Sequence, residues 1–231
     1  MTSPSIPVSS PQSAKRKRSL SLPAWLVLIC VVSFSILLGA GAAIQKNAPP
    51  IPTTIVSPQQ EVLITQAQIQ SGQETYLARG GQHIGSVWGH GSYLAPDWSA
   101  DFLHKWGLAT AGVLQNGNPD FDQADLEALS VGDRASLQAR VSEQFKINRY
   151  SPETQVLTLT TAQVKALPQV FADYQKLLTQ GSRVHSIPSG WFTSNEQVRD
   201  VTSFFAWTAW QLLRIGLMHP FPTLQIFRMI P

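Results

Sequence analysis

An uninterrupted run of uncharged, mostly apolar residues near the N-terminus constrains this chain more than any other feature. The run extends from Leu22 to Ile44, which is 23 residues without a charged side chain. As a helix rising about 1.5 Å per residue it would measure about 35 Å, enough to cross a hydrocarbon core of about 30 Å. Pro23 stands at its start, where a helix tolerates proline. We therefore expect a transmembrane anchor over residues 20–45, in which Cys30 serves packing.

Four basic residues precede the apolar run and indicate its orientation. Lys15 to Arg18 form a KRKR patch at the end of a basic tail, residues 1–19. Positive charge marks the cytoplasmic side of a membrane helix. We therefore expect a single-pass protein of a bacterial inner membrane, with a cytoplasmic N-terminus and a periplasmic main domain. A cleaved signal peptide is the alternative, because Ala40-Gly41-Ala42 resembles a cleavage site, but signal h-regions are shorter, at about 7–15 residues.

The charge distribution argues against nucleic acid as a partner. From Lys46 onward the chain has 13 Lys and Arg against 14 Asp and Glu, so the excess of basic residues is confined to the KRKR patch. A nucleic-acid interface needs basic residues clustered on the folded domain. The single cysteine also excludes an internal disulfide and any zinc site made of cysteines.

Periodicity after the anchor predicts a mainly α-helical domain. Four prolines between Ala48 and Pro58 indicate an extended linker, assigned to residues 46–60. The main domain is expected over residues 61–210, with at most a short β element near 155–159. Helices are predicted over residues 65–79, 97–114, 124–129, 133–145, 161–178 and 194–213, with a cap at Thr160 or Thr161 and a capping box at Ser194.

The stretch GSVWGHGSYLAPDWSADFLHKW, residues 85–106, concentrates the groups that could carry chemistry. Asp97, Asp101 and His104 would share one face of a helix and could bind a divalent metal or relay protons. The structural alternative is that Asp97 caps the helix, Asp101 pairs with Lys105, and His104 makes one hydrogen bond. His90 could enter a ligand pocket or brace its glycine-rich loop. These four residues are the weak candidates for a metal site; no catalytic or cofactor-binding residue is assigned.

Three blocks of sequence resemble the N-terminal region of quinol-dependent nitric oxide reductases. They are WGHGSYLAPDWSADFLHKW (88–106), INRYSPETQVLTLT (147–160) and FFAWTAW (204–210), and they follow the family's order and spacing. The resemblance implies a cytochrome-c-like outer domain, without haem, joined to a membrane core. In that family the core holds haem b, haem b3 and a non-haem iron, takes electrons from quinol and produces nitrous oxide in denitrification.

The chain departs from the family pattern in ways that bear on its activity. It has no C-x-x-C-H motif for covalent haem c, and the core's redox centres are not in its 231 residues, so we expect the chain alone to be inactive. Residues 211–231 do not resemble the family, and we expect an aberrant tail caused by a frameshift or truncation near position 211.

The expected partners are membrane lipid and either the reductase core or a second copy of the chain. An accessory subunit of a separately encoded haem-containing core is one alternative, with FFAWTAW as its contact. A stand-alone periplasmic module that binds a metal or small ligand is another. The aromatic residues at 204, 205, 207 and 210 cover most of a helix circumference. That pattern indicates either deep burial or a surface that meets protein or lipid.

Overall fold

The computed structural model describes residues 21–47, 50–89 and 96–218, and it divides into two units that meet between Ala48 and Pro49. In the first unit the described residues form one helix, α1 (Leu22–Asn47), whose segment Leu22–Ala43 is long and apolar enough to cross a membrane. Its apolar side chains are exposed. The hydroxyl of Ser35 donates to the carbonyl of Val31, which satisfies this polar group inside the helix.

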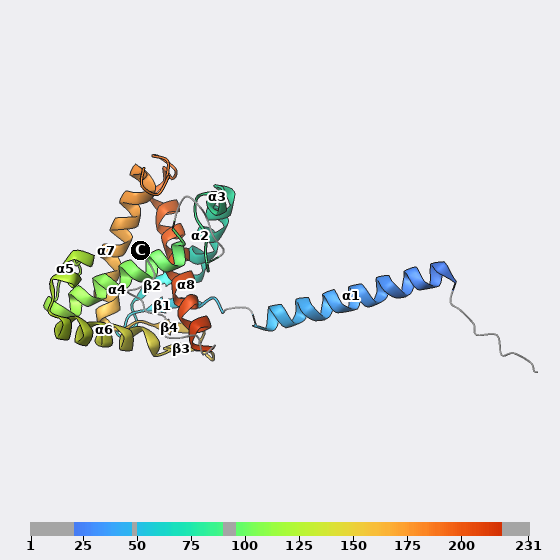
Figure 1. Ribbon diagram of the computed structural model, residues 1–231, viewed down its shortest axis with the longest axis horizontal. Helices are drawn as coiled ribbons and strands as arrows, with labels where there is room; N and C mark the ends of the chain where they lie inside the picture. The colour runs from blue at the N-terminus through green and yellow to red at the C-terminus, as the bar shows by residue number, and fades with distance from the viewer. Residues whose placement is uncertain (1–20, 48–49, 90–95, 219–231) are drawn as a thin grey trace, which may run out of the picture. The chain divides into compact units, whose positions relative to one another are not determined.

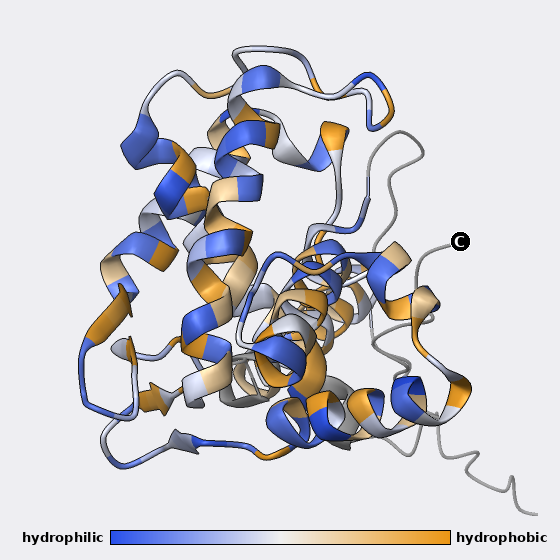
Figure 2. Cartoon of the chain, turned by 90° about the vertical axis from the view of Figure 1, so that its left-hand side faces the viewer, coloured by the Kyte–Doolittle hydropathy of each residue, from blue (hydrophilic) through white to orange (hydrophobic). Residues whose placement is uncertain are grey.

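The second unit is mainly helical, as predicted, with a small sheet (Figure 1). Hydrophobic and hydrophilic residues alternate along its helices, seen as orange and blue in Figure 2. The elements are β1 (Thr54–Val56), β2 (Val62–Thr65), α2 (Gln66–Ala78), α3 (Gly81–Ile84), α4 (Trp98–Asn116), α5 (Gln123–Ala128), α6 (Val131–Lys146), β3 (Tyr150–Ser151), β4 (Val156–Thr158), α7 (Thr161–Gln180) and α8 (Asn195–Met218).

Local capping explains where several helices begin. Thr65 and Thr160 each form a capping box with the glutamine three residues on, so two backbone N–H groups at each helix start have side-chain partners. A cap at Thr160 or Thr161 was predicted from the sequence, and the structure places it at Thr160. The glutamine of the box expected at Ser194 has another partner, because the amide oxygen of Gln197 accepts from the guanidinium of Arg79 at 3.4 Å.

The sheet is larger than the single β element predicted near residues 155–159. Its strand order is β2-β1-β4-β3, with β1 parallel to β4 and antiparallel to β2. β1 lies inside the segment expected to be a proline-rich linker. That segment is extended, as its prolines favour, but Ile55 and Val56 are buried, so it belongs to the folded domain. Three-residue strands are too short to show a period in sequence.

Close packing of α8 against α2 forms the centre of the domain. Gly72 of α2 lies against the backbone of Asp200 in α8, and a Cβ at this position would overlap the Asp200 carbonyl. The hydroxyl of Ser71 donates to Asp200 Oδ2 at 2.7 Å beside this contact. Glycine is therefore required here for two helix backbones to approach each other.

The aromatic residues of α8 are buried inside the domain, which decides between the two alternatives left by the sequence. Phe204, Phe205, Trp207 and Trp210 are all at least nine-tenths buried. The indole nitrogen of Trp207 donates to the carbonyl of Pro50 at 3.1 Å. The prediction that FFAWTAW forms a contact with another protein is therefore wrong, because this chain itself supplies the packing partners.

Replacing Gly72 with alanine should destabilise the domain by at least about 2 kcal/mol, because the added methyl group forces α2 and α8 apart. Gly132→Ala provides a matched control, since a Cβ at Gly132, in α6, meets no atom within 4 Å. That control should leave stability unchanged or raise it by up to about 1 kcal/mol. Urea unfolding of the full chain in detergent measures both changes, and equal stabilities for the two variants would contradict this packing.

Candidate functional site

Asp97 acts as a structural brace at the start of α4. Its Oδ1 accepts from the backbone N–H of Ala100 at 3.0 Å, which caps the helix. Its Oδ2 accepts from the hydroxyl of Ser86 at 2.9 Å and from the backbone N–H of Gly89 at 2.5 Å. One carboxylate oxygen therefore caps α4, and the other holds Ser86 and Gly89 beside the start of the helix.

Asp101 lies one turn further along α4 and forms a buried polar cluster with α7. Its Oδ2 accepts from the hydroxyl of Tyr174 at 2.6 Å and from Lys105 Nζ at 2.7 Å. The Lys105 ammonium also lies 4.7 Å from the centre of the Tyr174 ring. The Lys105 pair was predicted from the i, i+4 spacing. The contact with Tyr174 was missed, because the sequence identified Tyr174 only as part of an apolar helix stripe.

The described candidates Asp97, Asp101 and His104 do not form a three-ligand metal group. Across residues 21–47, 50–89 and 96–218, no group of three His, Cys, Asp or Glu side chains could hold a metal ion. His104 is half-buried on α4 and does have an interaction partner. His90 lies outside the described residues. The described geometry of Asp97 and Asp101 follows the structural alternative, in which the first carboxylate caps the helix and the second pairs with Lys105.

Stacked aromatic rings fill the space between α4, α7 and α8. Trp98 stacks on Phe205 with ring centres 5.1 Å apart and planes 7° apart. Phe102 stacks on Tyr174 at 5.5 Å, and Tyr76 of α2 meets Phe205 edge-on at 5.7 Å. All five side chains are at most 1% exposed. Offset and edge-on ring pairs of this kind add stability beyond the area they bury.

This interior does not fit a covalently bound haem. Attachment through two thioether bonds needs two cysteines and an axial histidine in a C-x-x-C-H motif, and the chain has one cysteine, Cys30 in α1. The rings of Trp98, Phe102 and Phe205 meanwhile occupy the middle of the helical core. The described core is filled by side-chain packing.

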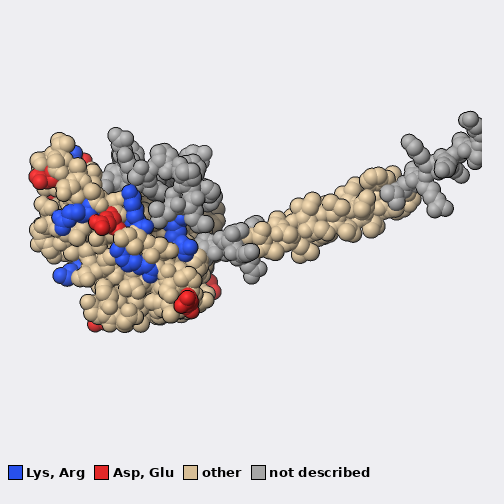
Figure 3. Space-filling model, turned by 90° about the horizontal axis from the view of Figure 1, so that it is seen from below, with Lys and Arg blue, Asp and Glu red and all other residues tan. Residues whose placement is uncertain are grey.

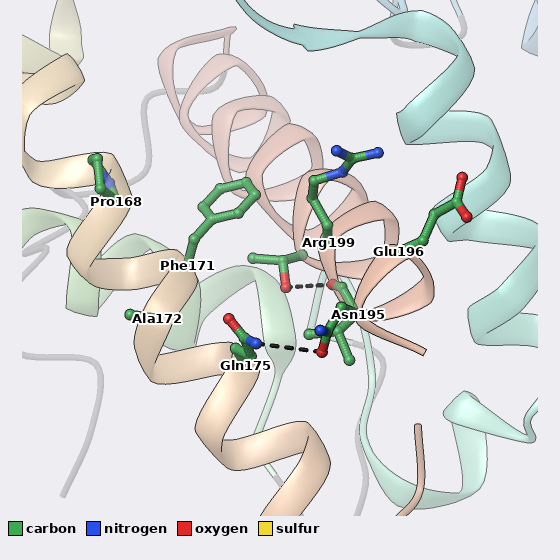
Figure 4. Close-up of a pocket in the computed structure, with 9 residues that line it drawn as sticks. Pro168, Phe171, Ala172, Gln175, Asn195, Glu196 and Arg199 are labelled. Atoms are coloured by element: carbon green, nitrogen blue, oxygen red, sulfur yellow. Dashed lines mark hydrogen bonds between the residues drawn. The ribbon is translucent and has the colours of Figure 1, made fainter. Parts of the chain in front are cut away.

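A groove of about 710 Å³ lies apart from this core, between α7 and α8. Figure 4 shows its lining residues projecting from the two facing helices, with the Phe171 ring directed toward α8. A hydrogen bond from Gln175 to Asn195 crosses the groove at 3.4 Å. The lining combines apolar residues with Glu196 and Arg199, and it contains neither Asp101 nor the other predicted site residues.

The fold and interior define a class of protein: a mainly helical domain that follows an apolar helix and offers no site for covalently attached haem. A model of the family described as the cytochrome c-like domain of NorB, a nitric oxide reductase component, matches residues 52–213. The match covers well over half of the chain, and the chain therefore belongs to this family, as the sequence resemblance indicated. A search of curated proteins finds no match.

The Tyr174 hydroxyl should make stability depend on pH. Burial, and then the neighbouring Asp101 carboxylate, raise the pKa of Tyr174 well above its usual value of about 10. The folded state therefore holds this proton more tightly than the unfolded state. Its contribution to stability is fully present below about pH 10 and is lost as the pH rises further, by about 1.4 kcal/mol per pH unit.

Tyr174→Phe should cost about 1–3 kcal/mol at neutral pH, because Asp101 loses a buried donor, and should remove this part of the alkaline loss. Urea unfolding of both chains at pH 8 and at several values above 10 compares the slopes. Parallel slopes in the variant and the unmodified chain would show that Tyr174 is not held protonated by the fold.

Proposed function

We propose that this chain is the membrane-anchored outer portion of a nitric oxide reductase, and that its domain has a structural role without a redox centre of its own. The family reaction reduces nitric oxide to nitrous oxide with quinol as the electron donor. In this proposal the reaction takes place in a membrane core that holds haem b, haem b3 and a non-haem iron. The outer domain covers the outer face of that core and shapes the access of water or protons.

The main support for the proposal is the packed aromatic interior of a domain that matches the NorB family. Trp98 and Phe205 stack where the core helices converge, and C-x-x-C-H is missing from the sequence. A domain built in this way can hold its shape without a cofactor. Its contribution to the reductase would then come from its surface and its position, not from electron transfer.

The apolar helix and the basic patch support the proposed location. α1 has the length and composition of a membrane span, and its segment Leu22–Ala43 contains no charged residue. The KRKR patch before it favours a cytoplasmic N-terminus under the positive-inside rule. We propose a single pass through a bacterial inner membrane, with residues from Pro50 onward in the periplasm and lipid as the first partner.

The reductase core, or a second copy of the chain, is the proposed protein partner. Any contact with the core has to use a surface other than the aromatic side chains of FFAWTAW, since these are buried within the domain. A separately encoded core would make the chain an accessory subunit with the same structural role. The alternative of a stand-alone metal-binding module is less well supported, because Asp97 and Asp101 already have partners inside the protein.

The chain expressed in a bacterium that matures c-type cytochromes should remain in the membrane fraction and contain no covalent haem. The physical reason is that a single cysteine cannot supply two thioether bonds. Haem staining of a denaturing gel and the absorbance near the Soret band measure this directly, with Cys30→Ala as the matched control. A stoichiometric Soret band in the purified chain, or its release from the membrane by carbonate, would contradict the proposal.

A further inference from the structure

The covalent connection between α1 and the outer domain is short. α1 ends at Asn47, and Pro50 is already held by the domain, so three peptide steps join them. At about 3.5 Å for each fully extended step, Pro50 lies at most about 11 Å along the chain from the end of α1. If α1 spans a bilayer, the part of the domain surrounding Pro50 therefore lies close to the bilayer surface.

Pro50 is fixed to the last turns of α8. Its carbonyl accepts from the indole nitrogen of Trp207 at 3.1 Å and from the side-chain amide of Gln211 at 2.8 Å. These two residues stand four positions apart, so they share one side of the helix. Two hydrogen bonds from the buried helix α8 therefore fix the position of Pro50 within the domain.

A basic and partly apolar surface adjoins this point. Trp210, next to Gln211 in sequence, packs against Tyr150 with ring centres 5.5 Å apart. The Arg214 guanidinium lies 5.7 Å from the Tyr150 ring and 5.4 Å from the Trp210 ring. Arg149 precedes Tyr150, and its guanidinium donates to the carbonyl of Gln144 in α6 at 2.8 Å. The C-terminal end of α6 therefore lies beside Arg149 and Tyr150.

The end of α6 adds an exposed cation and an exposed apolar side chain. Lys146 is exposed, and Ile147 beside it is 52% exposed. Figure 3, the view of the domain from below, shows Lys and Arg side chains gathered on the side where α6 and β3 lie in Figure 1, with an acidic side chain among them. Unlike Lys146, Arg149 and Arg214 are half-buried. Glu143 and Glu153 are the nearby acids in sequence, so three basic residues stand against two acidic ones.

We propose that this surface, formed by Lys146, Ile147, Arg149, Tyr150 and Arg214 and called the tether face, binds the anionic phospholipid headgroups of the bilayer that α1 spans. The proposal rests on the membrane anchoring proposed above. Basic residues attract anionic lipid, while Tyr and exposed aliphatic side chains favour the boundary between headgroups and acyl chains. The short connection keeps the tether face within reach of the headgroups, so lipid binding fixes how the domain stands on the membrane.

The test uses the full chain in vesicles, with one fluorescent label per molecule. Cys30→Ala removes the native thiol, and Ile147→Cys then carries an environment-sensitive dye on the tether face. Val184→Cys is the matched control, because Val184 is 86% exposed and follows the C-terminal end of α7. α7 has 20 residues and begins three residues after β4, so its far end lies about 30 Å along the helix from the end that follows the sheet.

Quenching by lipids that carry a nitroxide on the headgroup reports contact with the bilayer surface. We expect quenching at position 147 in vesicles of phosphatidylcholine with phosphatidylglycerol, a strong decrease in phosphatidylcholine alone, and little quenching at position 184 in either. Lys146→Glu should lower the equilibrium constant for binding of the tether face to the anionic bilayer at least about fivefold. Lys176→Glu, which reverses an exposed lysine on α7, should leave the contact unchanged.

Failure of the membrane anchoring and failure of the lipid contact give different results in this experiment. Chains that do not float with the vesicles would overturn the anchoring, and the lipid contact with it. Chains that float but show equal quenching at positions 147 and 184, or quenching at 147 that ignores lipid charge, would overturn the lipid contact and leave the anchoring in place.

Discussion

The contact between α2 and α8 at Gly72 is the constraint on which the rest of the outer domain depends. Because the glycine lets the two backbones approach closely, α8 can pass through the middle of the domain instead of lying on its surface. Phe205 then reaches the stack formed with Trp98, and Trp207 reaches the carbonyl of Pro50. One short contact between helices thus positions the aromatic core and the point at which the chain enters the domain.

Aromatic side chains make up much of the interior of this cytochrome c-like domain. Five large rings from α2, α4, α7 and α8 fill the core. Both hydroxyl groups among them have partners: Tyr174 donates to Asp101, and Tyr76 donates to the carbonyl of Gly85 at 2.7 Å, whereas the buried indole nitrogen of Trp98 has none. Such pairing matters because a buried polar group without a partner destabilises the fold by about 1–3 kcal/mol. The stretch that first suggested an active site, residues 85–106, supplies much of this core and its bracing.

Helices were the part of the structure that the sequence predicted best. The apolar stripes of α6 and α7 and the caps at Asp97 and Thr160 are local patterns, and the structure confirms them. β1 and its pairing with β4 could not be predicted, because their register depends on residues about 100 positions apart. The contact between Asp101 and Tyr174 is equally non-local. The burial of Trp207 and Trp210 was undecided in the sequence, since composition does not say whether an aromatic helix packs within its own chain.

The most direct test of the account is whether the purified, haem-free chain has a rigid aromatic core. Near-ultraviolet circular dichroism measures the fixed surroundings of Trp and Tyr rings, and it can be followed through thermal unfolding in detergent. A domain completed by its own side chains should give a strong near-ultraviolet signal that disappears in one cooperative transition, with no change when haem is added. A weak signal without a cooperative transition, restored by adding haem, would contradict the claim that side chains complete this domain.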